Sequence, residues 1–276
     1  MAETIDVSAY LERIGYAGRA APDLDTLRVL QRRHAQTIPF ENLNPFVGWP
    51  VRLDAASLQQ KLVHDGRGGY CYEHNLLFSH VLRALGFDVT WLAARVTMGL
   101  PEHAVGGRTH MLLLVALDGA PYVVDVGFGG LTLTAPLRLQ TDVEQTTPHE
   151  PFRLREAGDE FIVEAKIAGE WRALYRFGLQ KQLLPDYEMC NWYLSHHPES
   201  RFVVNLVAAR PDADRRHALR NNELAVHYLD GRTEKRMLQS VEELKQALEG
   251  VFRVSLPDAP ELRTALARVA SMPVPT

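Results

Sequence analysis

The spacing of apolar residues changes near residue 87, and this change constrains the fold more than any other feature of the sequence. Before it, apolar side chains recur every three or four residues, which is the pattern of amphipathic helices. After it, short β-branched and aromatic runs separated by turn signals continue to about Arg176, as in antiparallel strands. The sequence predicts a helical bundle followed by an antiparallel sheet or barrel. Side chains that can cap the first helices are Asp6 or Ser8, Asp23 or Asp25, and Asp54.

The rest of the chain mixes both patterns. Residues 185–198 are predicted to be helical, residues 201–210 to form a strand, and residues 223–238 to form a hairpin that turns at Asp230 and Gly231. Ser240 and Glu243 form a capping box that predicts the start of a helix, and a last helix is expected near Pro260. Because no repeat or long linker is present, we expect the parts to pack as one body.

Composition excludes several classes of function. The 276 residues are 46% hydrophobic and 23% charged, as in an ordinary globular protein, and the net charge of -4 gives no basic footprint for nucleic acid. The start of the chain lacks the pattern of a signal peptide, and the longest apolar run, residues 111–117, is too short to span a bilayer. We therefore expect a cytoplasmic protein with no nucleic-acid or membrane partner.

The two cysteines, Cys71 and Cys190, are expected to be reduced in that compartment. Neither belongs to a CxxC pair, and the histidines show no HxxxH spacing, so no metal site is predicted. Cys190 is expected to be a packed residue. For Cys71 the sequence poses the question of whether the thiol is reactive.

Cys71 lies in the segment RGGYCYEHN, residues 67–75, where a loop with two glycines meets a predicted helix that ends near Gly86. The positive end of the helix dipole and the free backbone N–H groups there favour a thiolate and can stabilise an oxyanion. Most free cysteines, however, are only small buried hydrophobes. The position of Cys71 alone does not decide between these interpretations.

A predicted hairpin over residues 109–126 supplies further evidence. A type I′ turn at Asp118 and Gly119 would pair Leu117 with Ala120 and place Asp125 opposite Leu112. His110 would then lie two residues along on the same face, as a diagonal neighbour of Asp125. That spacing lets the carboxylate hold one imidazole nitrogen while the other faces outward.

Cys71, His110 and Asp125 thus have the composition of a cysteine-protease-like Cys-His-Asp triad, in the order nucleophile, base and orienting carboxylate. A thiol beside an imidazolium is largely ionised at neutral pH, and the thiolate is the nucleophile. Such a triad equally suits an acyltransferase, a thiol hydrolase or a transglutaminase-like amidase, because either water or an amine can resolve the acyl-enzyme. A binding protein that has kept the fold is a further alternative, which an intact triad disfavours.

Four motifs occur in order along nearly the whole chain: IPFENL at residues 38–43, RGGYCYEHN at 67–75, Thr109-His110, and DVGFGG at 125–130. Together they resemble the arylamine N-acetyltransferase family, and the length resembles its bacterial members. The resemblance implies acetyl-CoA-dependent N-acetylation of arylamines, arylhydrazines and N-hydroxyarylamines by a ping-pong mechanism through an acetyl-cysteine. It also implies an α+β fold of three parts: a helical bundle with the cysteine (1–87), an antiparallel β-barrel with the histidine and aspartate (88–198), and an α/β lid (199–276).

The resemblance implies further site residues. Phe40, Phe128 and Phe202 would form an aromatic wall around a small arylamine or hydrazine acceptor, although core packing is an alternative for each. Glu41 and Arg67 would form a buried ion pair that supports the cysteine loop. Thr109, Gly129 and Gly130 would contact acetyl-CoA, the acetyl donor. Glu73, two residues after Cys71, would point away from the thiol and have a structural role. The sequence leaves open whether the chain forms a homo-oligomer.

Overall fold

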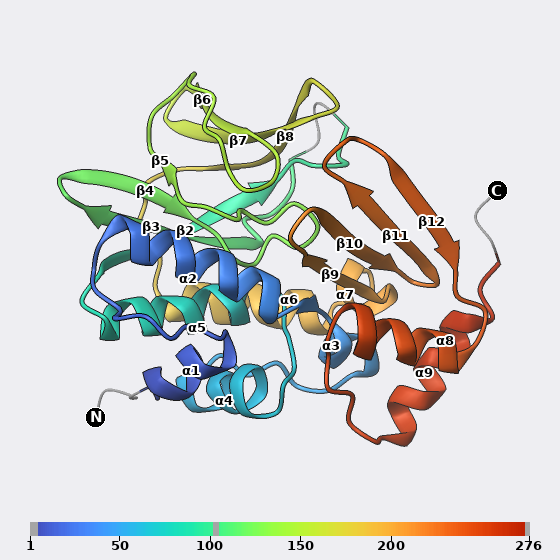
Figure 1. Ribbon diagram of the computed structural model, residues 1–276. Coiled ribbons are helices and arrows are strands. Elements are labelled where there is room, and N and C mark those ends of the chain that lie inside the picture. Colours follow the sequence, from blue (N-terminus) through green and yellow to red (C-terminus); the bar gives the residue numbers. More distant parts are fainter. Residues whose placement is uncertain (1–4, 102–104, 274–276) are drawn as a thin grey trace.

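The computed structural model describes residues 5–101 and 105–273, in which a layer of helices lies beneath a curved sheet and a second sheet lies beside it (Figure 1). The predicted helix caps are confirmed, since Asp6, Asp23 and Asp54 accept hydrogen bonds from the backbone N–H groups of Ala9, Thr26 and Ser57. The N-terminal helices are α1 (Val7–Arg13), α2 (Leu24–Thr37), α3 (Leu43–Val47), α4 (Ala55–Gln59), the π-helix η1 (Gln60–His64) and α5 (Cys71–Ala84).

The curved sheet has seven antiparallel strands in the order β5-β4-β3-β2-β8-β7-β6. Its strands are β2 (Asp88–Val96), β3 (His110–Leu117), β4 (Ala120–Val124), β5 (Leu137–Arg138), β6 (Phe152–Ala157), β7 (Glu160–Ile167) and β8 (Glu170–Phe177). The predicted register of the β3–β4 hairpin is confirmed from Leu117 opposite Ala120 to Leu113 opposite Val124. Asp118 and Gly119 have φ of 50° and 74°, as a type I′ turn requires.

Gln145 nearly closes this sheet into a barrel. Its backbone pairs with Phe152 of β6, at one edge of the sheet. Its side-chain amide forms hydrogen bonds of 2.8 and 2.9 Å with the backbone N–H and carbonyl of Arg138 in β5, at the other edge. One residue therefore bridges the two edge strands, which limits the number of unpaired backbone groups.

A smaller sheet in the order β1-β9-β10-β11-β12 joins one strand from the N-terminal part of the chain to four strands from its C-terminal part. The short β1 (Phe40–Glu41), within the segment predicted to be helical, pairs with β9 (Val207–Pro211). The other strands are β10 (Arg215–Arg220), β11 (Glu223–Tyr228) and β12 (Thr233–Met237), where the predicted hairpin is confirmed. The remaining helices are α6 (Leu184–His196), α7 (Arg201–Val204), α8 (Val241–Gln246), the π-helix η2 (Ala247–Val251) and α9 (Pro260–Ala270).

The prediction of one strand over residues 201–210 was wrong in its first half. Ser200 accepts a hydrogen bond from the backbone N–H of Phe202 and begins the short helix α7, so the strand starts only at Val207. A local cap outweighed the β-branched pair Val203-Val204. The structure places Phe202 on a helical turn rather than in a sheet.

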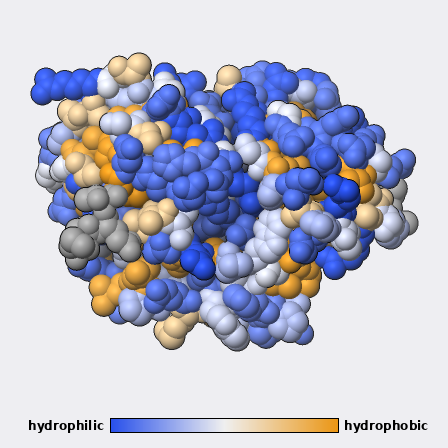
Figure 2. All heavy atoms as spheres, turned by 90° about the horizontal axis from the view of Figure 1, so that it is seen from below, coloured by the Kyte–Doolittle hydropathy of each residue, from blue (hydrophilic) through white to orange (hydrophobic). Residues whose placement is uncertain are grey.

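Three hydrophobic cores hold these layers together: one between the helices and β3, one inside the barrel-like sheet, and one between the smaller sheet and the helices α8 and α9. The face beneath the helices is mostly hydrophilic, with scattered apolar patches (Figure 2). No helix within the described part of the chain is both long and apolar enough to cross a membrane.

Candidate active site

Cys71 is the first residue of α5, and the loop before it is held against β1. The backbone N–H of Glu41 donates to the carbonyl of Gly69 at 2.8 Å. A side chain at Gly68 would overlap the carbonyl of Pro39, and one at Gly69 would overlap the carboxylate of Glu73. The two glycines are therefore required for the close approach that places the thiol at the helix N-terminus.

His110 and Asp125 meet beside this helix end. His110 Nε2 lies 2.7 Å from Asp125 Oδ2, and both side chains are buried. Burial disfavours the imidazolium, but Asp125 and Cys71 outweigh it and raise the pKa of His110 to about 10. Burial likewise disfavours the Asp125 carboxylate, yet His110 and two N–H donors lower its pKa. Because Nε2 is held by Asp125, Nδ1 is the nitrogen free to serve Cys71.

Sequence analysis missed two residues that join α5 to the Asp125 loop. The Asn75 amide donates to Asp125 Oδ1 at 3.1 Å and to the Met111 carbonyl at 2.8 Å. A Cβ on Gly127 would lie 2.8 Å from Cys71 Cα, so only glycine fits there. The signal for Asn75 was its position four residues after Cys71, on the same helix face. Gly127 lies within the motif DVGFGG at 125–130, but nothing in that motif indicated its contact with Cys71.

A cavity of about 120 Å³ opens at the thiol and brings together residues from distant segments. The predicted residues that line it are Cys71, Thr109, His110, Phe40, Phe128, Phe202, Gly129 and Gly130. Asp125 lies behind His110, outside the lining. The lining residues that sequence analysis missed are Val96, Met98, Gly127, Leu194, Arg201 and Val207.

Aromatic rings shape this cavity from two sides. The ring centroids of Phe40 and Phe202 are 6.0 Å apart. Phe128 contacts His110 edge to face, with centroids 5.1 Å apart. The guanidinium carbon of Arg201 lies 5.2 Å from the Phe202 ring centroid, and partial burial lowers the pKa of Arg201 although Cys71 opposes this effect. The result is an apolar slot with one cation at its rim.

The Glu41–Arg67 ion pair expected from the resemblance is present and buried. Arg67 Nη2 and Nε lie 2.7 and 3.0 Å from Glu41 Oε1. Burial disfavours the Glu41 carboxylate, but Arg67 and Lys61 hold its pKa at about 2. The pair therefore stays charged and ties β1 to the loop that precedes Cys71.

Glu73 points away from the thiol. Its carboxylate accepts from the backbone N–H of Tyr70 at 3.0 Å and from Lys61 Nζ at 2.6 Å, so it caps the first turn of α5. Cys190 is half-buried, and its sulfur lies 3.6 Å from the carbonyl of Arg108. Neither residue lines the cavity.

A chain of buried hydrogen bonds supports the same loop from below. Tyr10 Oη lies 2.8 Å from His34 Nδ1, His34 Nε2 lies 2.8 Å from His74 Nδ1, and His74 Nε2 lies 3.1 Å from the Pro39 carbonyl. Burial is the main cause that lowers the pKa of both histidines, that of His74 to about 4. The carbonyl can only accept, so His74 Nε2 carries the proton, His34 Nε2 donates to His74, and Tyr10 donates to His34.

Within residues 5–101 and 105–273, no group of three His, Cys, Asp or Glu side chains is arranged to hold a metal ion.

Comparison with known proteins agrees with the motifs. A family model described as N-acetyltransferase matches residues 23–261. The arylamine N-acetyltransferase of Mycolicibacterium smegmatis is 44% identical over 97% of this chain and 98% of its own length. The arylamine N-acetyltransferase / N-hydroxyarylamine O-acetyltransferase of Salmonella typhimurium is 36% identical over 91% of this chain and 89% of its own length.

Solved structures agree as well. Mycobacterium marinum arylamine N-acetyltransferase in complex with CoA superposes with a TM-score of 0.92 at 41% identity, over 96% of this chain and 99% of that one. The predicted resemblance is thus confirmed in both sequence and structure. The chain belongs to the arylamine N-acetyltransferase family.

Proposed function

We propose that this protein transfers an acetyl group from acetyl-CoA to arylamines, arylhydrazines and N-hydroxyarylamines by a ping-pong mechanism. The observation that carries the proposal is the convergence of Cys71, His110 and Asp125 at the small aromatic cavity, with His110 held 2.7 Å from Asp125. In a family whose members are named for this transfer, that arrangement supplies a nucleophile, a proton carrier and an orienting carboxylate.

In the first half-reaction, the Cys71 thiolate attacks the thioester carbonyl of acetyl-CoA. A carbon–sulfur bond forms to Cys71, the bond to the CoA sulfur breaks, and the CoA thiol leaves with the proton from His110 Nδ1. Asp125 keeps the imidazole in the correct orientation and stabilises its charged form. Thr109, Gly129 and Gly130, which line the cavity, are proposed to contact the acetyl donor.

In the second half-reaction, the acceptor amine attacks the acetyl carbon on Cys71. His110, now neutral, takes a proton from the amine while the bond to sulfur breaks, and the thiolate–imidazolium pair is restored. Phe40, Phe128 and Phe202 are proposed to hold a flat acceptor, because stacked or edge-on rings favour aromatic ligands. Glu41 and Arg67 are proposed to act indirectly by fixing the cysteine loop.

Intact mass spectrometry tests the proposal directly. We expect a single acetyl adduct after brief exposure to acetyl-CoA without acceptor, which is stable in water, absent from Cys71→Ala, and discharged by an arylamine or hydrazine. Cys190→Ser is the matched control and should still form the adduct. Rapid loss of the adduct to water would favour a thiol hydrolase, and no adduct with any acyl-CoA would refute the assigned role of Cys71.

We also propose the division into a bundle (1–87), a barrel (88–198) and a lid (199–276). Two cores support it: the core inside the barrel-like sheet takes its residues from 92–177, and the core beneath the smaller sheet takes most of its residues from 206–272. The helix α6, which comes just before the proposed lid, packs Tyr187 and Leu194 into the core between the helices and β3. This packing supports a start of the lid after α6. The cytoplasmic location and any homo-oligomer formation stay predictions from the sequence.

A further inference from the structure

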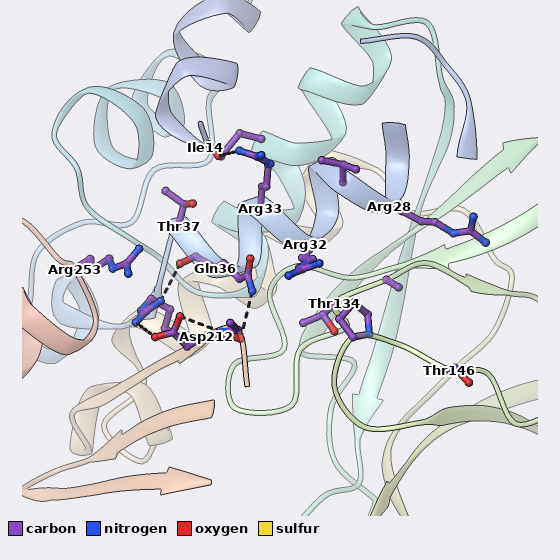
Figure 3. Close-up of a pocket in the computed structure, with 15 residues that line it drawn as sticks. Ile14, Arg28, Arg32, Arg33, Gln36, Thr37, Thr134, Thr146, Asp212 and Arg253 are labelled. Carbon is purple, nitrogen blue, oxygen red and sulfur yellow. Dashed lines mark hydrogen bonds and ion pairs between the residues drawn. The ribbon is translucent and has the colours of Figure 1, made fainter. Parts of the chain in front are cut away.

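A second, larger cavity of about 770 Å³ lies on the exposed face of α2, where all three parts of the molecule meet (Figure 3). Its walls are α2, the barrel loops at residues 134–135 and 146–148, the end of β9, and the segment after η2. It shares no lining residue with the cavity at Cys71. We call it the arginine basin, after its lining residues Arg28, Arg32, Arg33, Arg210 and Arg253.

The charges in the arginine basin are not balanced. Asp212 is the one carboxylate among its lining residues, against five arginines. Asp212 Oδ2 lies 3.2 Å from Arg210 Nη2 and is already engaged. Arg28 pairs with Asp25 at 3.1 Å, on the solvent side of α2. An excess of positive charge remains in a protein whose net charge is -4.

Arg210 is the buried anchor of the arginine basin. Its side chain donates to the carbonyl of Val251 at 2.8 Å and to that of Gln36 at 3.2 Å. Burial first, and then the like charge of Arg253, lower the pKa of Arg210. Both arginines line the same cavity, and an anion between them would relieve the repulsion between their like charges.

Arg32 and Arg253 are the uncompensated members. Neither side chain forms a hydrogen bond or ion pair with any residue in the described ranges, 5–101 and 105–273. Arg253 also has φ of 61°, just after the C-cap of η2 at Phe252. Glycine is the usual residue at such a left-handed position, so the backbone here tolerates strain while it presents a guanidinium to the arginine basin.

Two other lining groups suit oxygen-rich anions. Thr37 and Thr146 supply hydroxyl groups at the cavity wall (Figure 3), whereas the hydroxyl of the buried Thr134 is engaged with Thr147 and His149. No aromatic residue is part of the lining, so the cavity has none of the aromatic rings that line the cavity at Cys71. Guanidinium forks match the oxygens of phosphate groups in two-point contacts.

We propose that the arginine basin binds a small anion with at least two phosphate groups, at a site separate from the acetyl-transfer site. The excess of positive charge calls for more than one phosphate group, and the volume accommodates them. The proposal does not depend on acetyl transfer, because it rests on the charge and geometry of a cavity on the exposed face of α2.

Calorimetric titration of the full-length protein with inorganic pyrophosphate tests this. We expect one site whose affinity falls as salt is added, because salt screens exposed charges. The double variant Arg32→Gln with Arg253→Gln should bind at least tenfold more weakly. The matched control, Arg52→Gln with Arg236→Gln, removes the same charge from exposed positions outside the arginine basin and should change the affinity less than twofold.

A charge reversal and the acetylation assay complete the test. Arg32→Glu alone should weaken pyrophosphate binding more than Arg32→Gln does, with the thermal melt used to check folding. The double variant should keep its KM for acetyl-CoA within twofold of the wild type. A tenfold rise in that KM would make the arginine basin part of the donor site. Absence of pyrophosphate binding by the wild type, or equal weakening in the control, would overturn the proposal.

Discussion

Charged side chains are arranged in opposite ways at the cavity around Cys71 and in the arginine basin. Around Cys71 the buried charges are paired at hydrogen-bond distance: His110 with Asp125, Arg67 with Glu41, and Lys61 with Glu73. In the arginine basin, Arg32 and Arg253 are exposed and have no partner among the described residues. A buried charge must be neutralised within the fold, whereas water can support an exposed one until a ligand arrives.

The largest effect is expected when one of the three residues Cys71, His110 or Asp125 is replaced. We expect His110→Gln and Asp125→Asn each to lower kcat/KM for acetyl transfer by about a thousandfold or more, because the thiol loses its proton acceptor or the imidazole loses its orientation. Cys71→Ser should show no acetyl adduct by mass. Circular dichroism should show that all three variants fold. Retention of more than a tenth of the activity by any one would contradict its assigned role.

The next largest effect concerns the buried pair under the cysteine loop. Glu41→Gln should reduce the free energy of unfolding in urea by about 3–5 kcal/mol, because Arg67 is left as an uncompensated buried cation. The matched control is Glu144→Gln, which removes an exposed partner of Lys166 and should cost less than about 1 kcal/mol. Equal losses of unfolding free energy in the two variants would show that burial does not determine how much the ion pair stabilises the fold.

The histidines should give opposite responses to pH. His34 and His74 are buried and their pKa values are lowered, so the unfolded chain binds more protons below about pH 6.5. Stability should therefore fall from pH 6.5 towards 4, which is about the pKa of His74. The raised pKa of His110, about 10, contributes stability that is present below pH 6.5 and lost as pH rises towards 10.

Urea unfolding at pH 7 and pH 5 checks the acidic arm of this prediction. His74→Gln should lose less stability between these two pH values than the wild type, because one neutral buried imidazole has been removed. His196→Gln replaces an exposed histidine and is the control, which should behave like the wild type. A wild type equally stable at both pH values would rule out neutral burial of the pair.

The smallest effect is expected in the arginine basin. Arg253→Gly should raise the free energy of unfolding by up to about 1 kcal/mol without phosphate, because glycine accepts the left-handed backbone and a like charge beside Arg210 is removed. Thermal melts should show a small rise for this variant and no change for Arg52→Gln. A clear loss of stability in Arg253→Gly would mean that the guanidinium contributes to the fold itself.

Local patterns were enough to predict much of this molecule. The capping residues Asp6, Asp23 and Asp54 and the two-residue turn at Asp118 and Gly119 act over a few residues, so the sequence specifies them directly. The register of that turn then predicted the meeting of His110 with Asp125, which the structure confirms at 2.7 Å.

Contacts across long separations were not predictable in the same way. Asn75 reaches Asp125, Gly127 packs on Cys71, and Gln145 bridges β5 and β6, yet none of these follows from neighbouring residues. The helix at 201–204 was missed because one serine cap outweighed a β-prone run. In each case the deciding partner is remote, or a single hydrogen bond overrides propensity.

By itself, the sequence determined the helix starts and the β3–β4 hairpin that brings His110 to Asp125, because their causes lie in backbone preference and short-range register. Only the tertiary structure decided that the barrel nearly closes, that residues from 40 to 207 line the cavity at Cys71, and that five arginines between residues 28 and 253 share one basin. Net charge averages over the whole surface, while an electric field depends on where the fold places each charge.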